Sequence, residues 1–139
     1  MSISDAPPEQ RTLFIDRCAW SGLLGRALTA ASIPFHHHAE FFEAACDDEV
    51  WLDGVAGKGW LVVTRDRRIR YKVNEQAAAV RAGLHLFVFA QGSIKAAQTA
   101  ETLVRAYPAM LRASAAIAAP SFHSLHLDGG VSRLKIGGA

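Results

Sequence analysis

The chain has 139 residues, of which 50% are hydrophobic and 20% charged, and 15 Lys and Arg against 13 Asp and Glu give a net charge of +2. This length and composition predict one globular domain and exclude an intrinsically disordered chain. Two cysteines exclude a disulfide framework, no Cys-x-x-Cys pair predicts a zinc site, and no apolar run is long enough to span a membrane. Because the N-terminal residues are polar, unlike a signal peptide, we expect a cytoplasmic protein.

Short apolar runs typical of strands alternate with segments of helical periodicity. We expect a flexible leader over residues 1–10 and a single domain over residues 11–139. The predicted strands are 12–16, 33–37, 60–64 and 84–90, and the predicted helices are 19–31, 48 to about 57, 74–82 and 94–116. Asp48 is expected to cap its helix, and Pro108 to interrupt or kink the last one.

The C-terminal segment predicts a β-hairpin, with strands over 121–127 and 131–136 around Asp128-Gly129-Gly130. The alternation of strands and helices predicts an α/β fold, a three-layer sandwich with a mostly parallel central sheet. The hairpin would form an appendage or an antiparallel edge. The long helix over 94–116 is expected mainly to cover one face of the sheet.

Acidic side chains follow three of the predicted strands. Asp16 ends the first strand, Asp48 begins the helix after the second, and Asp66 lies just past Thr64, where the strongest strand ends. Ligands of open α/β sheets bind at the carboxyl ends of the strands, so we expect these carboxylates to converge. A hard divalent cation such as Mg²⁺ relieves their repulsion, and can polarise a phosphoryl oxygen and activate water for attack on a phosphodiester.

A basic loop surrounds Asp66, because residues 65–72 contain five cationic side chains. Beside a metal these would hold a polyanionic substrate. The candidate phosphate contacts are Arg65, Arg67, Arg68 and Arg70. Taken singly, a strand-end Asp is often a turn or cap residue, and a basic loop is often only solvated surface. Their occurrence together is what predicts a site.

Four motifs occur in order along the chain: Phe14-Ile-Asp16, Asp48-Glu-Val-Trp51-Leu52, Gly59-Trp-Leu-Val-Val-Thr64-Arg-Asp66-Arg-Arg-Ile69 and Leu86-Phe-Val-Phe89. In this order and spacing they resemble the PIN-like domains, the compact nuclease fold used by VapC-type toxins of bacterial toxin–antitoxin systems. The resemblance extends over residues 13–134. It implies an endoribonuclease that depends on Mg²⁺ or Mn²⁺, an RNA substrate and a partner antitoxin. The small side chains of the predicted helix over 94–116 would also let it pack on an antitoxin or on a second copy of the chain in a homodimer.

By the same resemblance, Asp16, Asp48 and Asp66 would hold the metal, and Thr64 would orient a carboxylate or a water through its hydroxyl. Two features depart from the pattern. Many relatives carry Asn where this chain has Cys18. The usual fourth acid has no secure position, and the candidates are Asp47, which we include among the metal ligands, and Glu43.

These departures leave two alternative functions. The first is a catalytically inactive PIN-like binding module that keeps the fold to pair with another chain. The second is an aspartate phosphoacceptor resembling a receiver domain, with Lys95 as the cation that faces the phosphate. Receivers pair two acids at the first strand, whereas Arg17 follows Asp16 here.

Overall fold

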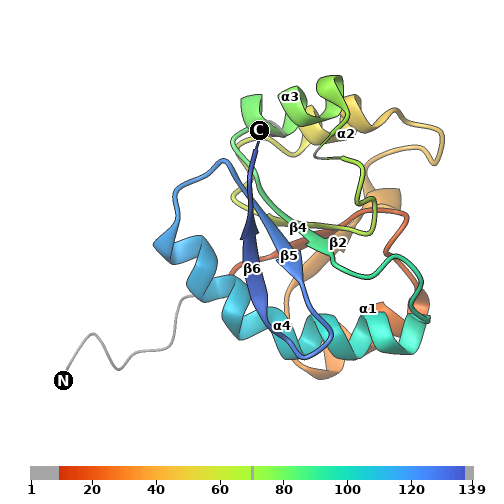
Figure 1. The fold of residues 1–139 in the computed structure, drawn as a ribbon. Coiled ribbons are helices and arrows are strands. Elements are labelled where there is room, and N and C mark those ends of the chain that lie inside the picture. Colours follow the sequence, from red (N-terminus) through yellow and green to blue (C-terminus); the bar gives the residue numbers. More distant parts are fainter. Residues whose placement is uncertain (1–9, 70, 137–139) are drawn as a thin grey trace.

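The structure is a computed structural model that describes residues 10–69 and 71–136, so the predicted leader lies almost wholly outside the described residues. Helices cover both faces of one sheet (Figure 1). The strands are β1 (Leu13–Ile15), β2 (Phe35–His37), β3 (Leu61–Thr64), β4 (His85–Phe89), β5 (Ser121–Leu125) and β6 (Val131–Leu134). The helices are α1 (Gly22–Ala30), the 3-10 turn η2 (His38–Glu40), α2 (Asp48–Gly54), α3 (Val73–Arg81) and α4 (Ala96–Ala116). This arrangement confirms the predicted α/β fold class.

The strand order across the sheet is β2-β1-β3-β4-β5-β6. The first five strands are parallel, and β6 runs antiparallel to β5, which confirms the predicted hairpin. Because β5 also pairs with β4, the hairpin completes the sheet at its edge. The chain moves from β1 to one side for β2 and returns to the other side for β3. The order therefore reverses between β1 and β3, where open α/β sheets bind their ligands.

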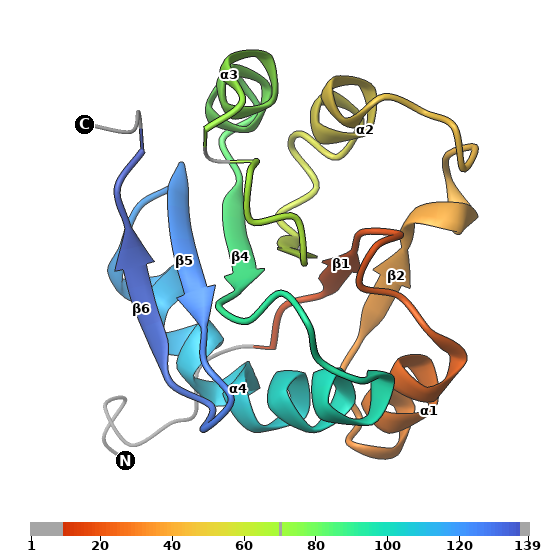
Figure 2. The ribbon, with the colours of Figure 1, turned by 45° about the vertical axis from the view of Figure 1, so that its right-hand side comes forward.

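Side chains alternate between the two faces of the sheet with the period of two that strands impose. In β1, Leu13 and Ile15 pack in the core beneath α1 and α4, whereas Phe14 packs in the core beneath α2 and α3. Figure 2 shows these helix pairs on opposite faces of the sheet. Since both faces are buried, β3 and β4 consist of continuous apolar runs, broken only at their ends by Thr64 and His85.

Helix ends follow local hydrogen bonding. Helix α1 begins after Ser21, whose hydroxyl accepts from the backbone N–H of Leu24 at 3.1 Å. The predicted cap at Asp48 is wrong by one residue, because Asp47 occupies the cap position of α2 and Asp48 is the first helical residue. The carboxylate of Asp48 instead accepts from Trp51 Nε1 at 2.8 Å. This bond turns the Asp48 side chain toward the core-facing side of α2.

The long helix α4 covers one face of the sheet, as expected, and buries Leu103, Ala106 and Met110 there. The predicted interruption is absent, since α4 continues through Pro108. Proline removes one backbone donor, and the burial of this helix face against the sheet outweighs that loss. None of the helices in the described part of the chain combines the length and apolar character needed to cross a membrane.

A buried polar chain lies on the α4 side of the sheet. His85 Nδ1 is 2.6 Å from Ser121 Oγ, and Ser121 Oγ is 2.8 Å from His123 Nε2. Burial lowers the pKa of both histidines, that of His123 to about 4, with further contributions from His85 and Arg133. The charge of Arg11 also lowers the pKa of His85. Both imidazoles are therefore neutral in the folded protein near neutral pH.

We expect the free energy of unfolding to fall as the pH is lowered from about 6.5 to about 4. The unfolded chain takes up these protons near the ordinary histidine pKa, whereas the folded chain resists them, so protons favour the unfolded state. The loss attributable to His123 is at most about 3 kcal/mol, because its pKa falls from 6.5 to about 4 and each pH unit is worth about 1.4 kcal/mol. Urea unfolding across this pH range measures it. His123→Gln should flatten the profile and the half-buried His126→Gln should not; equal profiles for all three proteins would contradict the assignment.

Candidate metal centre

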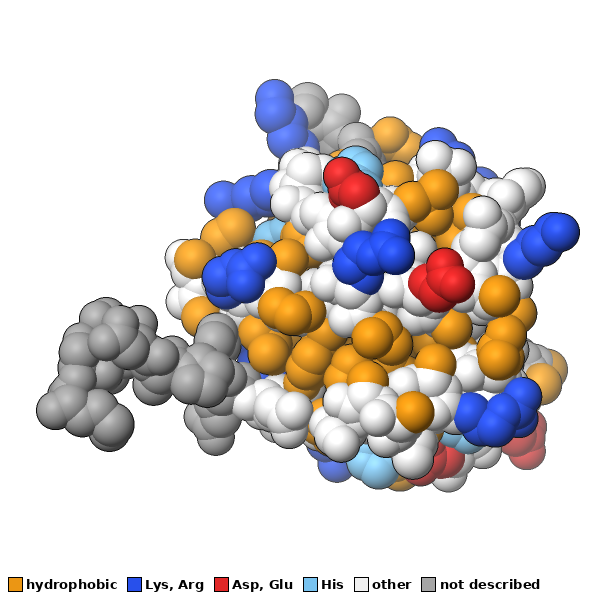
Figure 3. Space-filling model, turned by 90° about the horizontal axis from the view of Figure 1, so that it is seen from below, with side chains coloured by type: hydrophobic (Ala, Val, Ile, Leu, Met, Phe, Trp, Pro, Cys, Tyr) orange, Lys and Arg blue, Asp and Glu red, His pale blue; other side chains and the backbone are white. Residues whose placement is uncertain are grey.

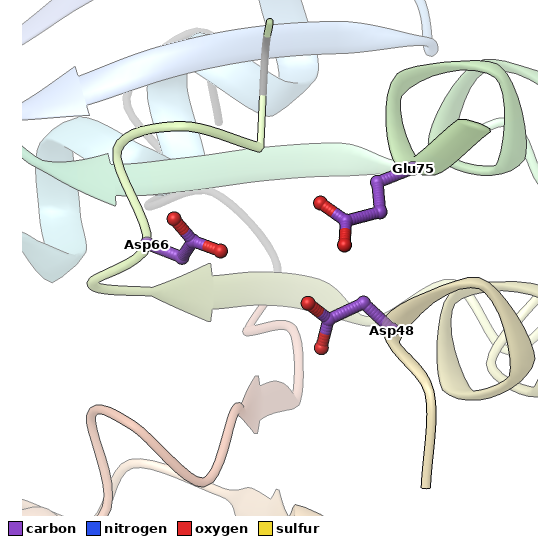
Figure 4. Close-up of side chains that lie close together, drawn as sticks. All are labelled: Asp48, Asp66 and Glu75. Carbon is purple, nitrogen blue, oxygen red and sulfur yellow. The ribbon is translucent and has the colours of Figure 1, made fainter. Parts of the chain in front are cut away.

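Three carboxylates from separate parts of the chain meet beside the carboxyl ends of the parallel strands (Figure 4). Asp48 projects from the first turn of α2, Asp66 follows β3, and Glu75 projects from the first turn of α3. One oxygen of each lies within 4.8 Å of the others, and all three residues are partly buried. We call this group the acidic cluster.

Glu75 is the member of the acidic cluster that sequence reasoning missed. The expected fourth acid, Asp47, has an exposed side chain at the cap of α2, and Glu43 is exposed in the connector before it. Neither belongs to the acidic cluster. The sequence signal that could have identified Glu75 was its position. Glu75 lies in the first turn of the helix that follows the basic loop, and that turn lies beside Asp66.

Asp16 is almost fully buried, with 4% of its surface exposed, and both of its carboxylate oxygens accept hydrogen bonds from neighbouring groups. Its Oδ1 atom accepts from the Arg17 backbone N–H at 2.7 Å, and its Oδ2 atom accepts from the Thr64 hydroxyl at 2.8 Å and the Cys18 thiol at 3.2 Å. The Thr64 hydroxyl in turn accepts from the backbone N–H of Asp66 at 3.1 Å. Asp16 and Thr64 thus fix the turn that carries Asp66.

Cys18 takes part in this network as a neutral donor. Its sulfur lies 3.3 Å from Thr64 Oγ1 and accepts from the Arg65 backbone N–H at 3.3 Å. Burial, followed by the negative charge of Asp16, raises the pKa of the Cys18 thiol. A protonated thiol is a poor nucleophile, so the geometry assigns Cys18 to positioning Asp16 and Thr64.

Cations partly balance the acidic cluster. Lys72 Nζ lies 3.7 Å from Asp66 Oδ2 and 3.5 Å from Glu75 Oε1. Arg17 Nη2 lies 3.7 Å from Asp48 Oδ1. These pairs are long, and the side chains of Lys72 and Arg17 are 40% exposed, so each pair contributes little stability. The carboxylates remain open to a stronger cation.

Three of the four predicted phosphate contacts, Arg65, Arg67 and Arg68, line a cavity together with Asp48 and Asp66. Arg65 donates from Nη2 to the Gly92 carbonyl at 2.7 Å, while Arg67 and Arg68 are exposed. Arg70 lies outside the described residues. This cavity has a volume of about 730 Å³ and is lined by acidic and basic side chains together. Its charged lining residues are Asp16, Asp48, Asp66, Arg17, Arg65, Arg67, Arg68 and Lys72.

The acidic cluster fits a hard divalent cation. Glu75 Oε2 is buried and has no hydrogen-bond partner within residues 10–69 and 71–136. Burial, followed by the neighbouring Asp48 carboxylate, raises the pKa of Glu75 even though Lys72 opposes the shift. A donor set made only of carboxylate oxygens is the set that Mg²⁺ and Mn²⁺ prefer. The repulsion and the unpartnered oxygen are both relieved when such a cation binds.

A family model described as a PIN-like domain matches residues 12–91, which is more than half of the chain. The chain belongs to the PIN-like domain family. PIN-like domains are commonly nucleases, so this PIN-like domain has a fold of the nuclease type. The matched segment contains the whole acidic cluster together with Asp16 and Thr64, and it ends before α4. Comparison with curated proteins and with solved structures gave no match.

Proposed function

We propose that this PIN-like domain is a metal-dependent endoribonuclease that hydrolyses RNA phosphodiesters. The observation that carries the proposal is the acidic cluster, with the buried and unpartnered Glu75 Oε2, beside a cavity that Asp48 and Asp66 line together with arginines. Carboxylates alone would repel a phosphodiester, and arginines alone would bind it without cleaving it. Their combination suits phosphoryl chemistry at a metal.

In this proposal, Asp48, Asp66 and Glu75 hold Mg²⁺ or Mn²⁺, and Asp16 is the candidate for a fourth ligand. The bound cation would supply a Lewis acid that polarises a phosphoryl oxygen and makes a nucleophile from water at neutral pH. Trp51 Nε1 orients Asp48, and the Asp16–Thr64 pair orients Asp66. Such supporting hydrogen bonds hold ligands in place before the metal arrives.

Arg65, Arg67 and Arg68 are the proposed contacts to the RNA backbone. They line the cavity that contains Asp66, so a phosphate held by them would lie beside the acidic cluster. Contacts of this kind are independent of sequence and weaken as salt rises. They would position the strand without choosing its bases.

We further propose that the protein is the toxin of a type II toxin–antitoxin pair in the cytoplasm. An apolar groove between α1 and α4 supports a protein partner, and Figure 3 shows hydrophobic side chains gathered on this face. Leu23, Ala27 and Val104 line the groove. An antitoxin or a second copy of the chain would bury these side chains. A small gene for a DNA-binding partner beside this one would support the antitoxin.

The receiver-like alternative gains no support from the cavity. Lys95 occupies the cap position of α4, where its side chain is exposed, and it is not among the residues that line the cavity with Asp66. The inactive binding module predicts neither stabilisation by Mn²⁺ nor cleavage. It is the outcome against which the nuclease proposal is tested.

We expect the purified protein to cleave RNA with Mg²⁺ or Mn²⁺ and to lose this activity in EDTA. Asp66→Asn should reduce cleavage to background while leaving the fold intact, because the amide removes one anionic ligand and keeps the shape of the side chain. Gel analysis of a labelled RNA measures it, and circular dichroism checks the fold. Asp47→Asn is the matched control and should cleave normally. Retained activity in Asp66→Asn with normal metal dependence would overturn the metal assignment.

A further inference from the structure

A second cavity, of about 470 Å³, adjoins the cavity lined by Asp48 and Asp66. The two share a wall, because Arg67 and Arg68 line both. The remaining lining residues of the second cavity come from the end of the basic loop and from the last three strands: Tyr71, Val88, Phe89, Ala90, Ser124 and Leu134. We call this second cavity the strand-end pocket.

The floor and rim of the strand-end pocket differ in chemistry. Val88 and Leu134 give it an apolar floor, and Ser124, which is buried, adds a hydroxyl. Tyr71 stands at the rim with 63% of its surface exposed. An apolar floor, one hydroxyl, an exposed ring and guanidinium planes match a nucleobase, which has flat apolar faces and a polar edge.

The position of the pocket fixes how a strand would pass. A phosphate held between Arg67 and Arg68 would lie on the shared wall. The cavity lined by Asp66 would then be on one side of the phosphate and the strand-end pocket on the other. A base attached beside that phosphate can enter the pocket only if it is unpaired, because bases inside a duplex are stacked and hydrogen-bonded to their partners. The geometry therefore selects a single strand.

We propose that the strand-end pocket binds one unpaired nucleobase of a single-stranded nucleic acid, stacked on Tyr71, while the adjacent phosphate lies between Arg67 and Arg68. This assignment rests on the proposed nuclease function for the position of the scissile phosphate. It adds a base-binding subsite, which a duplex would not fill although it could reach the arginines. Stacking tolerates any base, and the Ser124 hydroxyl gives the pocket one means of discriminating among base edges.

Binding of a fluorescein-labelled single-stranded RNA of mixed sequence, followed by anisotropy in EDTA, tests the pocket. Tyr71→Ala should weaken binding about tenfold, as removal of one base-stacking ring does. Tyr71→Phe, which keeps the ring, should bind like the wild type. Leu134→Glu places a carboxylate in the floor and should weaken binding to a similar extent. The same strand made as DNA should show the same dependence on Tyr71. A duplex RNA should bind Tyr71→Ala and Tyr71→Phe with the affinity that it has for the wild type.

The outcomes separate this proposal from the nuclease proposal. Wild-type affinity in both Tyr71→Ala and Leu134→Glu would overturn the pocket, even if cleavage depends on Asp66. Dependence on Tyr71 without any cleavage by the wild type would uphold the pocket and overturn the nuclease. Failure of the wild type to bind the single strand, or a Tyr71 dependence seen equally with duplex RNA, would also overturn the pocket.

Discussion

Glu75→Gln is expected to abolish both the stabilisation of the protein by Mn²⁺ and the cleavage of RNA. Glutamine keeps the size of the side chain but removes the charge that a divalent cation requires. A ligand that binds only the folded state adds about 2.7 kcal/mol at a hundred times its dissociation constant, so the wild type should melt at a clearly higher temperature with Mn²⁺. Thermal melting with Mn²⁺ and with EDTA measures the difference.

The same variant should behave in the opposite way in EDTA. Glu75 is partly buried beside Asp48, and the removal of one of two neighbouring charges relieves repulsion, so Glu75→Gln should be at least as stable as the wild type without metal. Glu43→Gln is the matched control, because Glu43 is exposed and lies outside the acidic cluster. An undiminished response of Glu75→Gln to Mn²⁺ would show that Glu75 does not hold the cation.

Trp51→Ala is expected to lower the free energy of unfolding by about 3–5 kcal/mol. Trp51 is fully buried, and its ring stacks on Phe14 with the centroids 5.6 Å apart. Trp51→Phe separates packing from polar support, because it keeps a ring but removes the donor to Asp48 Oδ1. We expect it to cost less stability than Trp51→Ala and to weaken Mn²⁺ binding about tenfold or more, as loss of such a supporting donor does.

Urea unfolding in EDTA measures the stability of these variants, and a Mn²⁺ titration followed by melting measures the affinity. Trp60→Phe is the control. Trp60 also stacks on Phe14 at 5.6 Å, but it precedes β3 at the end of the strand away from the acidic cluster. It should alter stability and leave Mn²⁺ affinity unchanged. If Trp51→Phe binds Mn²⁺ as tightly as the wild type, the Trp51 donor has no role in holding Asp48.

The predictable part of this fold is the part encoded locally. The apolar runs at β3 and β4 are buried on both faces, so continuous hydrophobicity alone identified them as central parallel strands. Because the carboxyl ends of parallel strands lie together, the sequence also predicted that Asp48 and Asp66 would lie close to each other.

The rest depends on contacts between distant segments. Glu75 in the first turn of an alanine-rich helix looks like an ordinary N-terminal charge, and only the packing of α3 beside α2 brings it to Asp48. The passage of α4 through Pro108 depends on burial of its other side chains against the sheet. The strand-end pocket requires β5 and β6 to lie beside the basic loop, which no local pattern specifies.

The segment that matches the family ends at residue 91, so it contains the acidic cluster but neither β5 nor β6, which supply Ser124 and Leu134 to the strand-end pocket. The acidic cluster thus lies in one continuous stretch of the chain, whereas the strand-end pocket combines Arg67, Arg68 and Tyr71 from that stretch with residues of the hairpin. If the pocket binds a base as we propose, substitutions at Ser124 and Leu134 should change which base is preferred and leave the acidic cluster intact.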